Sequence, residues 1–379
     1  MLGLPEIRLV IIFFEKKGVS NQQNKIYQLF GEVVKRQASD LHLIAGLFPF
    51  VRVDGRLYSL PWPTPLTKEE TEELVFSLCT QEQREIITTN RELDFSYDFG
   101  NEGRFRINAY YQKDSLAAAF RLVPREVKSV EKLNLPQICH EFTKLRQGFV
   151  LVTGPTGHGK STTIASILAE INQTRPCHLV TIEDPIEFTF TPNKAIISQR
   201  EMNRDTYSWR LALRSVLRED PDVVFVGEMR DLETISAALT VAETGHLIFS
   251  TLHTNSAAQT IDRIVDIFPE GAREQIRIQF SSVLAGVVSQ RLVPALSGGR
   301  LPVAEIMLAS TAVRTAIREG KSHMIDNIIQ TSREVGMISL ETSLAELVNE
   351  GRVSFDVAQE YALRPQELLR LVGRARKTS

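Results

Sequence analysis

Apolar and polar residues alternate over several short stretches in the first third of the chain. Residues 94–99 and 105–109 both alternate in this way, which is the period of a strand with one buried face. The Gly-Asn-Glu-Gly stretch at 100–103 separates them and is typical of a hairpin turn. Residues 115–123 supply a third strand. The pattern predicts a small α+β domain over residues 21–123, built on an antiparallel meander.

Helix starts and a linker complete the prediction for this first domain. Thr67 and Thr80 are each followed three residues later by Glu or Gln, which is the pattern of a capping box, so we expect helices to begin there. Residues 124–136 begin and end with proline and carry charged residues between. We interpret them as a linker to a second domain.

In residues 137–379 the pattern changes to continuous apolar runs separated by helical segments. Continuous runs are expected of strands that are buried on both faces, and they occur at residues 149–153, 178–182, 223–226 and 246–251. Residues 231–243, between the last two runs, have the pattern of a helix, and so does the tail from Leu340 onward. Strands that alternate with helices predict an α/β fold with a mainly parallel sheet.

Composition narrows the class of protein further. The chain has 379 residues, which is too long for one core of ordinary size, and its net charge of −2 gives no sign of a nucleic-acid partner. Cys79, Cys139 and Cys177 form no CxxC pair, which excludes a four-cysteine zinc site, and we expect no disulfide framework. These features fit a globular protein of two domains in a reducing compartment.

Residues 1–20 do not have the form of a targeting signal. Their apolar run at 9–14 is followed by Glu-Lys-Lys, with no small-residue cleavage site after it. No run in the chain approaches the about 20 apolar residues of a membrane-spanning helix. We interpret residues 1–20 as an extension of unknown role with the composition of an extra strand, and we expect a cytoplasmic protein that works against a membrane.

The strongest chemical signal is a GxxxxGK[ST] stretch between an apolar strand and a helix. It comprises Gly154, Pro155, Thr156, Gly157, His158, Gly159, Lys160, Ser161 and Thr162. The glycines let the backbone turn tightly and direct N–H groups at phosphate oxygens. We expect Lys160 to reach the β- and γ-phosphates of ATP and Ser161 to ligate Mg²⁺. The alternative is a glycine-rich turn without a ligand, and the strand–loop–helix context favours phosphate binding.

Acids and histidines at the ends of neighbouring strands are candidates for the rest of the site. Glu183 follows the second apolar run and could bind Mg²⁺ or position water, and Glu228 follows the third and is a candidate general base. His246 and His253 flank the fourth run, and either could sense the γ-phosphate. His253 is favoured because open α/β sheets bind ligands at the carboxyl ends of their strands. The alternatives are solvated acids and histidines that make structural hydrogen bonds.

Together these motifs resemble the secretion ATPase family of type II secretion and type IV pilus systems, and most of all its pilus retraction ATPases. The resemblance rests on the phosphate loop, both histidine motifs and the segments 38–43, 103–108, 182–187 and 226–231. It implies a PAS-like N-terminal domain, a RecA-like C-terminal domain and a hexameric ring with nucleotide between subunits. It also implies that the ATPase works against an inner-membrane platform protein. This work withdraws pilin subunits and so powers twitching motility.

The resemblance assigns a further role to three arginines of the first domain. Arg104, Arg106 and Arg121 lie on its predicted strands, and in the family arginines at such positions reach the nucleotide across a subunit interface. The alternative is that they are strand-end charges in surface salt bridges, which stabilise little. A motif of the retraction ATPases, roughly Ala-Ile-Arg-Asn-Leu-Ile, reads Ala-Val-Arg-Thr-Ala-Ile at 312–317, where Arg314 is kept.

The sequence is therefore compatible with three functions. The first is a retraction motor. The second is an assembly or secretion motor of the same superfamily, which typically carries an additional N-terminal domain and a four-cysteine zinc insertion that this sequence lacks. The third is a nucleotide-dependent accessory subunit that does not hydrolyse ATP, and Glu228 together with the arginines argues against it.

Overall fold

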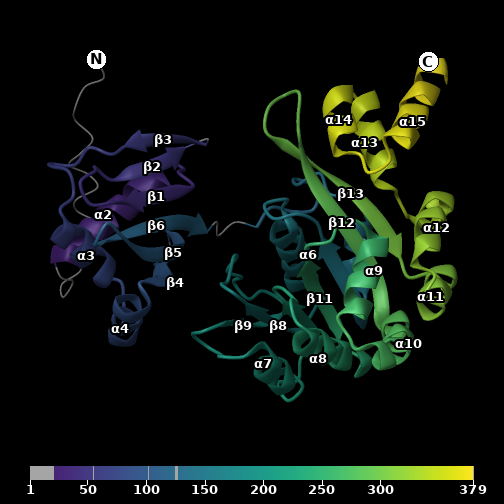
Figure 1. The fold of residues 1–379 in the computed structure, drawn as a ribbon, viewed down its shortest axis with the longest axis horizontal. Helices are drawn as coiled ribbons and strands as arrows, with labels where there is room; N and C mark the ends of the chain where they lie inside the picture. Colours follow the sequence, from purple (N-terminus) through teal and green to yellow (C-terminus); the bar gives the residue numbers. More distant parts are fainter. Residues whose placement is uncertain (1–20, 54, 101, 124–126, 379) are drawn as a thin grey trace. The chain divides into compact units, whose positions relative to one another are not determined.

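The computed structural model describes residues 21–53, 55–100, 102–123 and 127–378. They form two compact units, which divide in the chain between Arg125 and Glu126 (Figure 1). Each unit has its own sheet and its own hydrophobic core. The extension at 1–20, for which the sequence suggested an extra strand, lies outside the described residues. Within the described ranges, no helix is both long and apolar enough to cross a lipid bilayer.

The first unit is an α+β fold on a six-stranded antiparallel sheet with the order β3-β2-β1-β6-β5-β4. Its elements are α2 (Asn21–Lys35), β1 (Asp40–Leu43), β2 (Phe50–Val53), β3 (Arg56–Ser59), α3 (Lys68–Phe76), α4 (Gln81–Asn90), β4 (Glu92–Phe99), β5 (Gly103–Gln112) and β6 (Ser115–Val123). Thr67 and Thr80 form the predicted capping boxes of α3 and α4. Phe30 of α2 stacks on Phe105 of β5 with the ring centroids 3.9 Å apart, which joins helix and sheet.

The second unit is an α/β fold on a seven-stranded sheet with the order β13-β12-β7-β11-β10-β8-β9. Every neighbouring pair is parallel except β12 with β13, so the predicted mainly parallel sheet is confirmed. Its strands are β7 (Gly148–Thr153), β8 (His178–Glu183), β9 (Ile196–Glu201), β10 (Val223–Val226), β11 (Leu247–Leu252), β12 (Leu284–Pro294) and β13 (Arg300–Leu308). Its helices are α5 (Ile138–Lys144), α6 (Lys160–Thr174), α7 (Trp209–Val216), α8 (Leu232–Glu243), α9 (Ala257–Asp266), α10 (Arg273–Val283), α11 (Thr311–Arg318), α12 (Ile325–Thr331), α13 (Leu340–Asn349), α14 (Phe355–Tyr361) and α15 (Pro365–Thr378).

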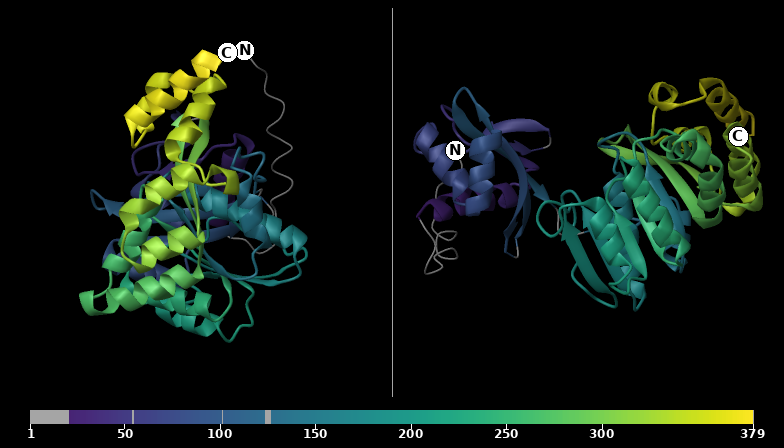
Figure 2. Two further views of the ribbon diagram at one scale, coloured as in Figure 1. Left: turned by 90° about the vertical axis from the view of Figure 1, so that its right-hand side faces the viewer. Right: turned by 60° about the horizontal axis from the view of Figure 1, so that its bottom comes forward.

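Helices cover both faces of this sheet (Figure 2). Alternate residues of one strand enter different cores: Leu151 of β7 packs in the cluster formed with α7 to α12, whereas Val150 packs in the cluster formed with α5 and α6. Burial on both faces explains why the central strands are continuously apolar in sequence. The carboxyl ends of the parallel strands are left at one edge of the sheet, where ligands bind in folds of this kind.

The long β12–β13 hairpin and β9 were not predicted from the sequence. Gly298 and Gly299 lie in the turn of the hairpin with φ of 88° and 74°, a conformation that glycine adopts without strain. The hairpin places β12 directly beside β7 and extends to the C-terminal helices α13 to α15 (Figure 1). Val293 and Val303 of the hairpin pack there in a buried cluster with Leu344.

Candidate functional site

The phosphate loop connects β7 to α6 at the carboxyl edge of the sheet. β7 is buried along its whole length, and α6 begins at Lys160. Gly159 has a φ of 80°, in the left-handed region that other residues rarely adopt. A Cβ at Gly154 would lie 2.2 Å from the carbonyl oxygen of Gln290. Gly154 and Gly157 also have positive φ, so the loop needs glycine for its backbone conformation and, at Gly154, for space as well. This is the context in which a helix N-terminus binds phosphate.

The ammonium group of Lys160 is held inside this loop. Its Nζ donates to the carbonyl oxygens of Gly154 at 2.8 Å and Pro155 at 3.0 Å, and it lies 3.4 Å from Nδ1 of His253. Lys160 is only 8% exposed. Burial lowers its pKa, against which the charge of Glu228 acts. A buried cation whose close contacts are neutral groups is suited to bind an anion such as phosphate.

His253 connects Lys160 to Glu228. A lysine ammonium can only donate, so Nδ1 of His253 accepts and Nε2 carries the proton, which it donates to Oε1 of Glu228 at 2.9 Å. Arg230 donates to Oε2 of the same carboxylate at 2.8 Å. Burial raises the pKa of Glu228, but the hydrogen bond from Arg230 and the neighbouring His253 outweigh this effect and the pKa is lowered. Glu228 is therefore a charged carboxylate at neutral pH.

Glu183 is the last residue of β8, whereas Glu228 follows the end of β10 by two residues, and the two carboxylates are placed differently. Thr181 Oγ1 donates to its Oε1 at 2.7 Å, Gln199 Nε2 donates to the same oxygen at 3.4 Å, and the Glu187 N–H donates to Oε2 at 3.3 Å. Burial raises the pKa of Glu183 to about 7. The carboxylate accepts these three hydrogen bonds and retains lone pairs, so a role of Glu183 in binding Mg²⁺ or positioning water stays a prediction. Glu183 also holds the turn between residues 183 and 187.

The residues at the loop suit a Mg²⁺ ion that is bound largely through its substrate. In the part of the chain that the structure describes, no three His, Cys, Asp or Glu side chains converge to hold a metal. A preformed cage is not needed, because Mg²⁺ in nucleotide sites is usually held by one or two protein ligands, phosphates and water. The half-buried Ser161, beside Lys160 at the start of α6, fits as such a ligand.

His246 is not brought to the phosphate loop within one chain. It precedes β11 at the amino ends of the strands, on the side of the sheet away from the loop. There its carbonyl oxygen accepts from the N–H of Gly148, the first residue of β7. Its Nδ1 lies 3.0 Å from both the Val241 carbonyl oxygen and the Thr244 hydroxyl. These contacts hold His246 at the amino ends of the strands, and its role as a γ-phosphate sensor stays a prediction, whereas His253 lies at the loop.

The three predicted arginines lie on β5 and β6 of the first unit. Arg106 is directly opposite Arg121 in the strand register, so two like charges face each other. Arg121 donates from Nε to Oδ1 of Asp40 at 2.9 Å, and its side chain is 69% exposed. Arg104 is nearly buried and donates to Asp98 at 3.2 Å. Arg104 thus joins β5 to β4, and Arg106 with Arg121 forms a positively charged pair.

Two residues at the loop were not singled out from the sequence. Arg230 contacts Glu228 from two positions further along the chain, and it had two signals in the sequence: its place after the third strand and its inclusion in the segment 226–231. Gln290 lies against the loop from β12. No sequence pattern indicated it, because the strand that carries it was not predicted.

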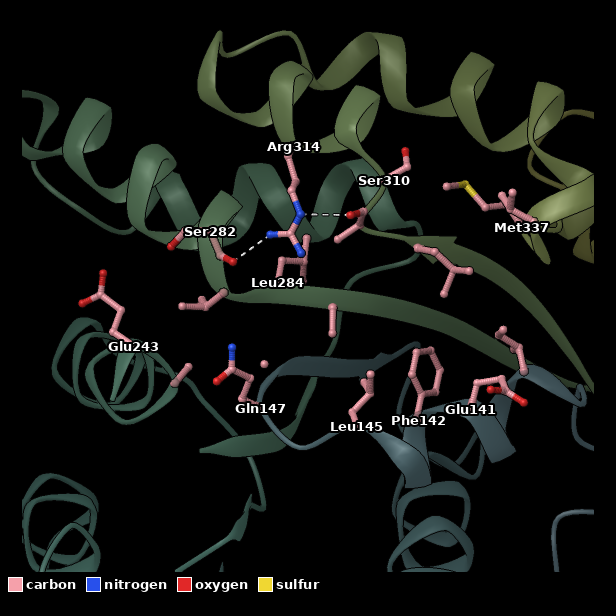
Figure 3. Close-up of a pocket in the computed structure, with 18 of the residues that line it drawn as sticks. Glu141, Phe142, Leu145, Gln147, Glu243, Ser282, Leu284, Ser310, Arg314 and Met337 are labelled. Carbon is pink, nitrogen blue, oxygen red and sulfur yellow. Dashed lines mark hydrogen bonds between the residues drawn. The ribbon is translucent and has the colours of Figure 1, made fainter. Parts of the chain in front are cut away.

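A cavity of about 920 Å³ lies at the opposite edge of the sheet from the loop, with Arg314 of α11 among its lining residues (Figure 3). Arg314 donates from Nε to the Ala309 carbonyl oxygen at 3.0 Å and from Nη1 to the carbonyl oxygens of Ser281 and Ser282. The two serines belong to the last turn of α10, where carbonyl groups lack partners within the helix. Arg314 is therefore not a free surface charge, because it caps α10 and joins it to α11.

The phosphate loop lies at the carboxyl ends of the strands of a parallel sheet. A lysine, a histidine and a carboxylate are connected there by hydrogen bonds. These features define the class of P-loop ATPases. The chain belongs to the family of Type II/IV secretion system proteins, which matches residues 126–362, and it is an ATPase.

Two relatives and one solved structure match this chain over most of their own length. The type IV pilus retraction ATPase PilT of Pseudomonas aeruginosa is 45% identical over 341 residues, which cover 90% of this chain and 99% of PilT. A twitching motility protein of Neisseria gonorrhoeae is 46% identical over 320 residues, 84% of this chain and 85% of that protein. The crystal structure of the pilus retraction motor PilT with bound ADP matches with a TM-score of 0.86 and 45% identity, over 91% of this chain and 99% of that one.

Proposed function

We propose that this chain is a hexameric ring motor that hydrolyses ATP to retract type IV pili and so powers twitching motility. It works at the cytoplasmic side of the inner membrane, against the platform protein of the pilus. The observation that carries the proposal is the series of contacts from Lys160 through His253 to Glu228 at the phosphate loop. This chain is also similar to a retraction ATPase over 99% of that relative's length. The site supports hydrolysis, and the likeness supports the direction of work.

Each group at the loop has a distinct task in this proposal. Lys160 exchanges its carbonyl partners for oxygens of the β- and γ-phosphates. Ser161 would hold Mg²⁺, which would supply positive charge to neutralise the phosphates. Glu228 orients the attacking water and accepts its proton. His253 lies between lysine and carboxylate, so it can report to Glu228 whether Lys160 is engaged by phosphate.

Deletion of the gene in its host tests the direction of work. A strain without a retraction motor is expected to carry excess surface pili and to lose twitching, because pili are still assembled but not withdrawn. Complementation with the wild-type gene should restore twitching, and complementation with Lys160→Ala should not. Cells without pili would instead identify an assembly motor, which contradicts the proposal.

A turnover assay on the purified chain separates a motor from a non-hydrolysing accessory subunit. We expect ATP hydrolysis in the presence of Mg²⁺ and a hexameric mass by light scattering. Binding of ATP without turnover, in a ring of the correct mass, would favour the accessory subunit.

Arg314→Ala is expected to impair retraction while ATP turnover of the folded protein stays substantially intact. A hydrogen bond from a charged donor contributes about 1.5–3 kcal/mol. Loss of the two hydrogen bonds that cap α10 should therefore also lower the free energy of unfolding, by roughly that amount for each bond. Arg318→Ala is the matched control, because Arg318 lies one turn further along α11 and donates to Thr315 in the same helix. Twitching assays, turnover and thermal unfolding check the three effects, and normal twitching by Arg314→Ala would contradict the first.

A further inference from the structure

The phosphate loop is supported from behind by a buried amide on β12. Gln290 is 2% exposed, and its Nε2 donates to the carbonyl oxygen of His158 at 2.8 Å. Thr163 of α6 is 1% exposed and donates its hydroxyl to Oε1 of Gln290 at 2.7 Å. With Thr163 bonded to the amide oxygen, the amide nitrogen of Gln290 faces the loop. Helix, amide and loop form one chain of satisfied hydrogen bonds.

These contacts determine how two peptide groups of the loop are oriented. In a trans peptide the C=O group and the following N–H point in opposite directions. Because the His158 carbonyl faces Gln290, the N–H of Gly159 points away from β12. Arg300 donates to the Gly157 carbonyl oxygen at 3.2 Å, which directs the His158 N–H away from Arg300 in the same manner. Consecutive N–H groups that point away from the supporting side chains are what a phosphate cradle requires.

The same side of the loop is closely packed against β12. A Cβ at Gly159 would lie 3.0 Å from Nε2 of Gln290. The ring of His158 accepts the Leu292 N–H at Nδ1, at 2.9 Å. Burial, together with the nearby Arg291, lowers the pKa of His158, so the neutral ring keeps this acceptor at neutral pH. The side chain and the backbone of the residue at 158 are therefore both attached to β12.

We propose that Gln290, oriented by Thr163, is a positioning residue that aims the Gly159 N–H at the diphosphate of the bound nucleotide and so sets nucleotide affinity. Gln290 acts through the loop backbone and lies on the side of the loop away from the phosphates. The inference rests on nucleotide binding at this loop and is independent of the direction in which the motor works.

Replacement of Gln290 by methionine keeps the length of the side chain and removes the hydrogen bonds. The dissociation constant for ADP, measured by calorimetry on the full-length chain, is expected to rise about 10- to 100-fold, and the constant for ATP by a similar factor. The turnover number at saturating ATP should change far less, because a contact used equally in ground state and transition state affects KM and not kcat. ADP affinity unchanged by Gln290→Met would overturn the inference.

Thr163→Val tests whether the threonine acts through Gln290. We expect a smaller loss of ADP affinity than in Gln290→Met, and no further loss when both substitutions are combined, because both remove one interaction. Additive losses would show that Thr163 affects the nucleotide by another route. This milder variant also keeps the proposal testable if Gln290→Met does not fold.

Asn172→Leu is the control for a general effect on stability. Asn172 is 6% exposed on the same helix, and its amide donates to the Thr191 carbonyl oxygen and accepts from the Asn193 N–H, both at 2.9 Å. We expect a lower melting temperature with unchanged ADP affinity. An equal loss of ADP affinity in this control would overturn a specific role for Gln290. Failure of the wild-type chain to bind ADP would instead refute nucleotide binding itself.

Discussion

Replacement of Arg121 by alanine is expected to slow ATP turnover by up to about 10³–10⁵, the range for arginine fingers, while ATP binding changes less. The transition state of phosphoryl transfer spreads negative charge over the γ-oxygens, and Lys160 with Mg²⁺ does not neutralise all of it. Arg121 is largely exposed and faces Arg106 across β5 and β6. Two guanidinium groups in this arrangement repel each other, and the Asp40 carboxylate offsets only one of the two charges, so a further anion between them is stabilised. We propose that this anion is the nucleotide of a neighbouring subunit.

Asp40 allows the structural explanation of Arg121 to be tested separately. The Asp40 carboxylate accepts from Nε of Arg121 at 2.9 Å and from the Ser39 hydroxyl at 2.7 Å. If Arg121 serves only to pair with Asp40, then Asp40→Asn should slow turnover as much as Arg121→Ala. If Arg121 acts on the nucleotide, Asp40→Asn leaves the arginine in place and most of the turnover should remain.

Mixed rings test whether the arginine is supplied by another subunit. Arg121→Ala lacks the arginine and Lys160→Ala lacks the lysine, so a ring of both contains some sites with both residues when the arginine comes from the neighbour. Recovery of turnover on mixing supports delivery between subunits. Where subunit exchange is demonstrated by a fluorescence label and no turnover returns, delivery within one chain is the better explanation.

Replacement of Glu228 by alanine or glutamine is expected to lower turnover by about 10²–10⁴, the usual range for a general base, while ATP still binds. The carboxylate lies next to His253 and Arg230, and the nucleotide-binding contacts of the loop are made by other residues. Binding of ATP to the variant can be measured directly, with Lys160→Ala as the control that loses affinity. Unchanged turnover would remove Glu228 from the mechanism.

Arg230→Gln tests the state of the Glu228 carboxylate. The hydrogen bond from Arg230 lowers the pKa of Glu228, so its removal should raise that pKa. A base must be deprotonated to act, and the acid limb of the pH profile of kcat should therefore move to higher pH. A profile that does not move would show that Glu228 does not titrate in the rate-limiting step.

Local signals in the sequence determined the elements and the position of the phosphate loop. The capping boxes at Thr67 and Thr80 and the loop ahead of Lys160 each lie within a few residues, so their physical causes are visible without long-range contacts. The place of Glu228 and His253 at one edge also followed from the sequence, because parallel strands end at the same side of a sheet.

Tertiary structure decided which of these side chains meet. Lys160 and His253 lie 3.4 Å apart because β7 pairs with β11 in a register that ends at Thr153 and Leu252. Glu183 ends one buried strand and Glu228 comes after another, yet only Glu183 is enclosed, by contacts that include Gln199 of β9. Gln290 reaches the loop from a strand that was not predicted. Strand order, register and burial arise from pairing between distant segments, and the local periodicity of a single chain does not specify them.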